Sequence, residues 1–66
     1  MILKKQLSSV GLTEDRSSEN YYNKEWTIVF DNICQEISRY DEFNDELTHI
    51  ANVSCFEELE DIIIRL

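Results

Sequence analysis

The residues best suited to chemistry in this 66-residue chain are eight carboxylates gathered in its last third. All of them lie between residues 41 and 61, a stretch that contains no Lys or Arg. They are Asp41, Glu42, Asp45, Glu46, Glu57, Glu58, Glu60 and Asp61. Carboxylates at this density can bind a divalent cation, transfer protons or attract a basic macromolecule.

The net charge of the chain is -8, and residues 41–61 account for the imbalance. The first 40 residues hold six acids against five bases and are almost neutral. Contacts to phosphate groups need clustered Lys and Arg, so the sequence argues against direct binding of nucleic acid and of anionic membrane surfaces. No segment approaches the length of a transmembrane helix. The charge therefore favours a basic protein as the partner.

The types and spacing of the residues argue against a metal site and against a catalytic site. The soft metal ligands are Cys34, His49 and Cys55, and their spacing matches no zinc module. Residues 41–52 lack the Gly that a calcium-binding EF-hand loop needs at its sixth position. His49 has carboxylates nearby but no nucleophile, and the chain has no Gly-rich phosphate loop. We predict a protein that is not an enzyme and that holds no metal and no cofactor.

The two cysteines indicate the compartment. The first ten residues contain two Lys and no apolar run of secretory length, so the sequence predicts a cytoplasmic protein with reduced thiols. Cys34 and Cys55 are then expected to act as small buried hydrophobic side chains.

The elements that must position these residues are predicted to be helices, because the chain has one Gly and no Pro. Residues 2–10 place apolar side chains at helical spacing and end at Gly11, which is typical of a short helix with a Gly stop. An edge strand over residues 2–7 is the alternative. Residues 12–20 are polar and indicate a loop, in which Ser17 or Ser18 could cap the next helix.

Residues 19–40 carry the longest apolar pattern with steps of three or four. Its members are Tyr22, Trp26, Val29, Phe30, Ile33, Ile37 and Tyr40. The pattern predicts an amphipathic helix, although residues 26–30 are also rich in strand-forming types. The helix is preferred because the alternation expected of a strand fails between Asp31 and Ile33. Ile28 lies off the helical stripe and is either a surface residue or a second contact.

Two further helices are expected in the acidic part of the chain. One runs over residues 41–52 with Asp41 as its N-cap, and the other opens at a capping box formed by Ser54 and Glu57. The last six residues could instead form a strand. No internal repeat is evident.

Together these patterns predict an all-α fold, a small bundle of three to four short helices, with an edge strand at one terminus as the variant. Residues 1–66 are expected to form a single domain, with residues 1–20 partly flexible and a helical core over residues 21–66.

The proposed function follows from the repulsion between neighbouring carboxylates, which lowers the stability of the folded chain. On a helix, carboxylates four residues apart lie side by side and repel one another, by roughly 0.2–0.5 kcal/mol a pair. Two antiparallel helices would gather the eight carboxylates on one side, about 6 Å apart along each axis, broadly as phosphates are spaced on a nucleic-acid strand. Tyr21 and Tyr40 would anchor the interface, whereas Phe43 is expected in the core.

This layout predicts a small acidic inhibitor that covers the basic nucleic-acid-binding surface of a nuclease, a host-defence effector or a transcription component. By analogy of charge and size alone, bacterial immunity proteins and phage-encoded antagonists of host proteins belong to this class. The alternative is a helical adaptor, a homodimer formed through Ile28, Ile62, Ile63 or Ile64, in which the acids serve solubility.

Overall fold

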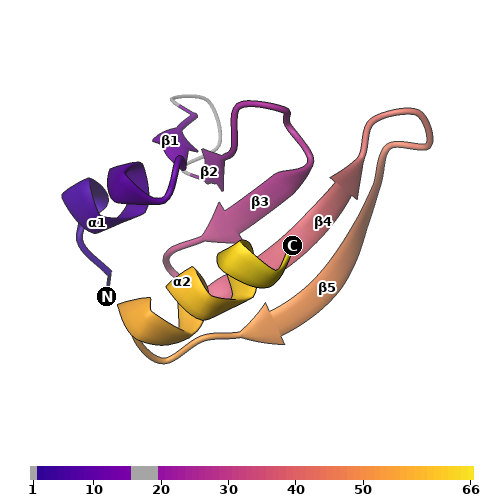
Figure 1. Cartoon of the computed structure of the whole chain (residues 1–66). Helices are drawn as coiled ribbons and strands as arrows, with labels where there is room; N and C mark the ends of the chain where they lie inside the picture. Colours follow the sequence, from indigo (N-terminus) through magenta and orange to yellow (C-terminus); the bar gives the residue numbers. More distant parts are fainter. Residues whose placement is uncertain (1, 16–19) are drawn as a thin grey trace.

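The protein is a five-stranded antiparallel sheet with a short helix at each end of the chain (Figure 1). The computed structural model describes residues 2–15 and 20–66. Helix α1 spans Lys4–Ser9 and α2 spans Phe56–Arg65. The strands are β1 (Thr13–Glu14), β2 (Tyr21–Tyr22), β3 (Ile28–Asp31), β4 (Glu36–Asp41) and β5 (Glu46–Asn52), and they follow one another across the sheet in chain order.

The predicted all-α bundle with a helical core over residues 21–66 is therefore wrong. The expected helix over residues 19–40 is replaced by β2, β3 and β4, and the expected helix over residues 41–52 by a turn and β5. The cap predicted at Ser17 or Ser18 lies outside the described residues. The two terminal helices agree with the prediction, and the last six residues are helical up to Arg65 rather than a strand.

The β3–β4 and β4–β5 turns are both stabilised by hydrogen bonds from backbone N–H groups to an Asp side chain. Asp31 accepts backbone N–H groups from Ile33 and Cys34, at 2.9 and 3.1 Å. Asp41, ten residues later, accepts those of Phe43 and Asn44 at 3.0 and 3.4 Å. Such Asp side chains mimic a backbone turn and replace the Gly and Pro that the chain lacks. The segments DNICQE and DEFNDE are thus a short structural repeat that the sequence reading missed.

Each of these turns ends on a residue in the left-handed region, Gln35 with φ 55° and Asp45 with φ 51°. The turn between β2 and β3 is built similarly, because the Asn23 side chain accepts the N–H groups of Thr27 and Ile28 at 2.8 and 2.9 Å. It ends on Trp26 with φ 60°. The failure of alternation after Phe30 is therefore a hairpin turn and not the continuation of a helix.

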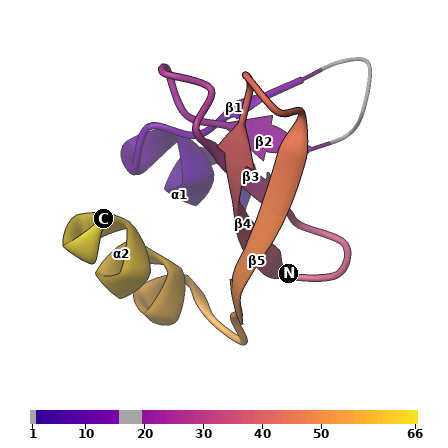
Figure 2. The same cartoon turned by 90° about the vertical axis from the view of Figure 1, so that its right-hand side faces the viewer.

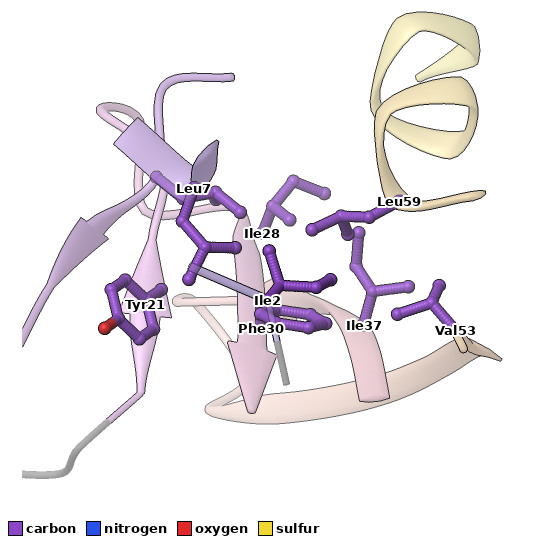
Figure 3. Close-up of a cluster of buried hydrophobic side chains, with 9 residues drawn as sticks. Ile2, Leu7, Tyr21, Ile28, Phe30, Ile37, Val53 and Leu59 are labelled. Atoms are coloured by element: carbon purple, nitrogen blue, oxygen red, sulfur yellow. The ribbon is translucent and has the colours of Figure 1, made fainter. Parts of the chain in front are cut away.

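Both helices lie on the same face of the sheet, as Figure 2 shows. The buried core forms between this face and the helices, and Figure 3 shows most of its side chains. The core consists of Ile2, Leu7, Leu12, Tyr21, Ile28, Phe30, Ile37, Val53 and Leu59. The Asn32 side chain fastens the N-terminal segment to the β3–β4 turn, donating to the Ile2 carbonyl at 2.9 Å.

Several single-residue predictions are corrected by this packing. Ile28 is in the core, because the register of β3 places it with Phe30 on the helix-covered face. Phe43 is 93% exposed at the β4–β5 turn rather than buried. Cys34 and Cys55 are exposed, free thiols rather than buried side chains. The pKa of the Cys34 thiol is raised by the neighbouring Asp31 carboxylate, which makes it a weak nucleophile.

The start of α2 differs in detail from the predicted capping box. The helix begins at Phe56, and the partner of Ser54 is Glu58 rather than Glu57. The Ser54 hydroxyl donates to Glu58 at 2.6 Å, and its N–H donates to the same carboxylate at 3.4 Å. These bonds lower the pKa of Glu58. None of the helices in the described part of the chain could span a membrane.

The turn interactions predict the effect of replacing Asp31. Asp31→Ala should lower the free energy of unfolding by roughly 0.5–1.5 kcal/mol, because two backbone N–H groups lose their acceptor. Asp31→Asn keeps a side-chain oxygen in place and should cost less. Urea unfolding followed by circular dichroism measures both values. Equal losses for the two variants would contradict the role of this oxygen in the turn.

The same carboxylates predict acid sensitivity. The N–H groups of Cys34 and Ile33 lower the pKa of Asp31, and hydrogen bonds from Asn44 and Phe43 lower that of Asp41. A carboxyl whose pKa is lower in the folded state stabilises that state above its unfolded pKa of about 3.9. The stabilisation is lost as the pH falls through the folded pKa. Urea midpoints from pH 6 to pH 2 should therefore fall less steeply for Asp31→Asn than for the parent protein.

Candidate functional site

The face of the sheet opposite the helices carries an aromatic surface. Residues paired across an antiparallel sheet point to the same side, so the register places Tyr22, Val29, Ser38 and His49 in one row on this face. Tyr40 and Leu47 form the neighbouring row. Val29 is 5% exposed although it lies outside the cluster between sheet and helices, and it borders the same hollow as Tyr22, Trp26 and Tyr40. We call this surface the open face.

A shallow hollow of about 300 Å³ lies on the open face. Its lining is Asn20, Tyr22, Trp26, Val29, Tyr40, Asp45 and Leu47. The rings of Tyr22 and Trp26 pack with centroids 4.8 Å apart and an interplanar angle of 41°. The Tyr40 hydroxyl donates to Asp45 at 2.8 Å, which raises the pKa of Tyr40 and aims this carboxylate at the hollow. The hollow thus combines aromatic walls with a negative charge.

Trp26 is the most unusual residue of this site. Its φ of 60° suits Gly or Asn, and a bulky residue in the left-handed region is disfavoured by about 1–2 kcal/mol. The only Trp of the chain occupies this position and is 52% exposed. Trp26 also borders a second hollow of about 430 Å³, which Glu14, Asp15 and Lys24 help to line. An exposed Trp in a disfavoured backbone conformation makes Trp26 a candidate binding residue.

The eight predicted carboxylates do not form one face. Asp41, Glu42, Asp45 and Glu46 lie at the β4–β5 turn, whereas Glu57, Glu58, Glu60 and Asp61 lie on α2. The first group therefore lies on a hairpin of the sheet and the second on a helix packed against the sheet. The predicted arrangement on two antiparallel helices is therefore wrong.

Several of the carboxylates also have internal partners. Asp41 closes its turn, Glu58 binds Ser54, and Asp61 forms an ion pair with Arg65 at 3.3 Å. In contrast, the side chains of Glu42 and Glu46 are exposed, and neither side chain forms a hydrogen bond or ion pair with the described residues. The charge available to a partner is thus concentrated at the β4–β5 turn, where Asp45 lines the hollow of the open face and Glu42 lines a cleft on the opposite, helix-covered face.

The two predicted anchors behave differently. Tyr40 lies on the open face, whereas Tyr21 points the other way and is 9% exposed in the core. Sequence reasoning missed Tyr22 and Trp26 as site residues because both were assigned to the buried stripe of a helix. Alternation over Ile28, Val29 and Phe30 was the signal that could have separated the two faces.

A larger cleft of about 630 Å³ lies on the helix-covered face, between the end of α2 and the strands. Its walls are largely apolar, with Leu12, Ile28 and Ile63 continuous with the core, and Arg39 and Glu42 also line it. The polar side chains that line this cleft carry both signs of charge. Within the described residues, no group of His, Cys, Asp and Glu could hold a metal ion.

The open face predicts how Trp26 contributes to stability. Trp26→Gly should change the free energy of unfolding by less than about 1.5 kcal/mol, because relief of the backbone conformation offsets the lost packing on Tyr22. Leu59→Ala, which removes a fully buried core side chain, is the comparison and should cost roughly 2–5 kcal/mol. Chemical unfolding measures both. A loss for Trp26→Gly as large as that for Leu59→Ala would make Trp26 a structural residue.

Comparison of the chain with protein-family models, with curated proteins and with solved structures gave no match.

Proposed function

We propose that this protein is a small acidic binding domain that recognises a basic surface of another protein through its open face. The observation that carries the proposal is the half-exposed Trp26, held at positive φ in an aromatic hollow beside the acidic β4–β5 turn. Aromatic side chains of this kind supply most of the energy of protein interfaces. Carboxylates at the rim accelerate the encounter with a positively charged partner.

The chemistry of the hollow fits a cationic side chain. A guanidinium or ammonium group binds the face of an aromatic ring, and such contacts contribute about 0.5–2 kcal/mol. Tyr22 and Trp26 supply the rings, and Asp45 supplies a carboxylate in the same hollow. An Arg side chain can stack on the rings and bind the carboxylate at once. A net charge of -8 makes an anionic ligand unsuitable.

Surfaces rich in Arg and Lys on cytoplasmic proteins are commonly those that bind nucleic acid. We therefore propose that the domain acts as an inhibitor or antagonist, covering the basic site of a nuclease, a host-defence effector or a transcription component. The partner's nucleic acid should compete with the domain for this site.

The homodimer alternative gains no comparable support. Ile28 is buried, and Ile62 and Ile63 pack against the core, which leaves Ile64, at 76% exposure, as the available side chain of the four. The charge of -8 on each copy also opposes association of two copies.

Charge reversal at two places separates a local acidic site from a general charge effect. The double variant Glu42→Lys/Glu46→Lys should weaken binding of a fluorescent peptide of alternating Arg and Thr by about tenfold at low salt. The matched variant Glu57→Lys/Glu60→Lys changes the net charge equally, but its residues lie in the first half of α2 and do not line the hollow of the open face. We expect less than about a threefold effect for it.

Fluorescence anisotropy across a salt series measures these affinities. Trp26→Gly should also weaken binding about tenfold while the domain stays folded. Equal effects of the two charge reversals, together with unchanged binding by Trp26→Gly, would contradict the proposed site. The inhibitory role is tested separately, by asking whether duplex DNA or RNA displaces the domain from a basic protein that it binds.

A further inference from the structure

The two edges of the sheet differ in a way that the open face does not explain. β1, at one edge, has two residues and offers little to an added strand. β5, at the other edge, has seven residues and no neighbour beyond it among the described elements (Figure 1). Exposed edges of this length are usually protected by Lys, Pro, an inward-pointing charge or a β-bulge. The pairing of β5 with β4 has one such irregularity, where the register shifts between Ile37 and Ser38. The sequence ELTHIAN of β5 contains no Lys and no Pro.

The backbone groups that β5 leaves unpaired can be assigned from the register. The Tyr40 N–H donates to the Thr27 carbonyl at 2.7 Å, so the backbone N–H and C=O groups of Tyr40 point toward β3. Backbone groups alternate in direction along an antiparallel strand, so the N–H and C=O groups of the neighbouring Arg39 and Asp41 form hydrogen bonds with β5. The backbone N–H and C=O groups of their partners, Thr48 and Glu46, therefore point toward β4. The N–H and C=O groups of Leu47 and His49 therefore point away from the sheet.

The free edge also borders the aromatic hollow. Leu47 is 61% exposed and lines the hollow from β5, on the same face as Tyr40 and His49. Strands in a sheet lie about 4.8 Å apart, so a strand added beside β5 would place alternate side chains over Leu47. A long cationic side chain at such a position would enter the hollow, where Trp26 and Asp45 form the other walls.

We propose that the partner binds through an extended basic segment, which pairs with β5 as a sixth strand and inserts a cationic side chain over Leu47 into the hollow. This inference rests on the proposed function and adds the mode of recognition. Main-chain hydrogen bonds to Leu47 and His49 give part of the affinity, and the charge of the segment gives the selectivity. A second copy of this chain is a poor occupant, because each copy carries a net charge of -8 and the two copies would repel one another.

Two peptides of equal charge test the pairing. A twelve-residue peptide of alternating Arg and Thr can form a strand, whereas one of alternating Arg and Pro lacks half of its N–H donors and resists strand pairing. In nuclear magnetic resonance of the 15N-labelled domain, the Arg-Thr peptide should slow hydrogen exchange of the Leu47 and His49 amides at least about tenfold. The inward-pointing amides of Glu46 and Thr48 are the internal reference and should change less.

A backbone variant gives an independent measurement. His49→Pro removes an outward N–H at an edge position that tolerates Pro, and it should weaken the Arg-Thr peptide by about tenfold. His49→Ala keeps the N–H and is the matched control, with little expected effect. Should His49→Pro unfold, the exchange measurement on the parent protein still decides.

The outcomes separate this inference from the proposed function. Equal binding of both peptides, with sensitivity to Trp26→Gly but no protection of Leu47 and His49, overturns strand addition and leaves the acidic aromatic site standing. Absence of binding by either peptide at low salt overturns both. Protection of Leu47 and His49 without any peptide, accompanied by a dimer in sedimentation equilibrium, would show that a second copy occupies the edge.

Discussion

The fold depends on side-chain oxygens that take the place of glycine and proline in its turns. Asn23, Asp31 and Asp41 each accept two backbone N–H groups, and each of the three turns ends on a residue with positive φ. Because the turns are tight, three consecutive strands can pair with their neighbours, and the sheet forms within a short chain. Without these acceptors the reversals would leave backbone donors unpaired, and β3, β4 and β5 would lose their register.

These turns, closed by side-chain oxygens, explain which parts of the structure the sequence could predict. Both terminal helices follow from local signals, a stop at Gly11 and apolar spacing over residues 56–66, and both are present. In the middle of the chain, periodicity alone predicts the wrong element because apolar residues in turns, such as Ile33, coincide with a step of three or four. Asp as the last residue before a four-residue connection, repeated after ten residues, was the informative pattern. Its meaning depends on long-range strand pairing, which periodicity alone does not report.

The site was only partly predictable for a related reason. The position of the acidic residues was evident, and Tyr40, predicted as an anchor, lines the same hollow as Asp45. Tyr21 and Tyr22 are neighbours in sequence, yet a strand sends one into the core and the other onto the open face. A helix would have placed them only about 100° apart. The distinction between anchor and core residue therefore required the strand assignment that the sequence reading did not make.

A chain of this length also cannot cover both faces of a five-stranded sheet with two short helices. The covered face supplies the core, and the uncovered face must be compatible with water while it protects side chains such as Val29. Tyr22, Trp26 and Tyr40 meet both needs, since each has an apolar body and a polar tip. A stable, monomeric domain could meet them with smaller or more polar residues, so stability alone does not account for the choice of Trp at a position with φ 60°.

The acidic β4–β5 turn lies at one end of β5, the exposed edge of the sheet. A seven-residue edge without Lys or Pro would invite pairing with any extended chain, including another copy of the protein. Glu42, Asp45 and Glu46 stand at one end of that edge and repel chains of the same charge, so that self-association is opposed without a structural block. The same carboxylates attract a basic segment. One cluster of charge therefore discourages the wrong strand and favours the right one, which is how specificity arises when attraction and repulsion act at the same surface.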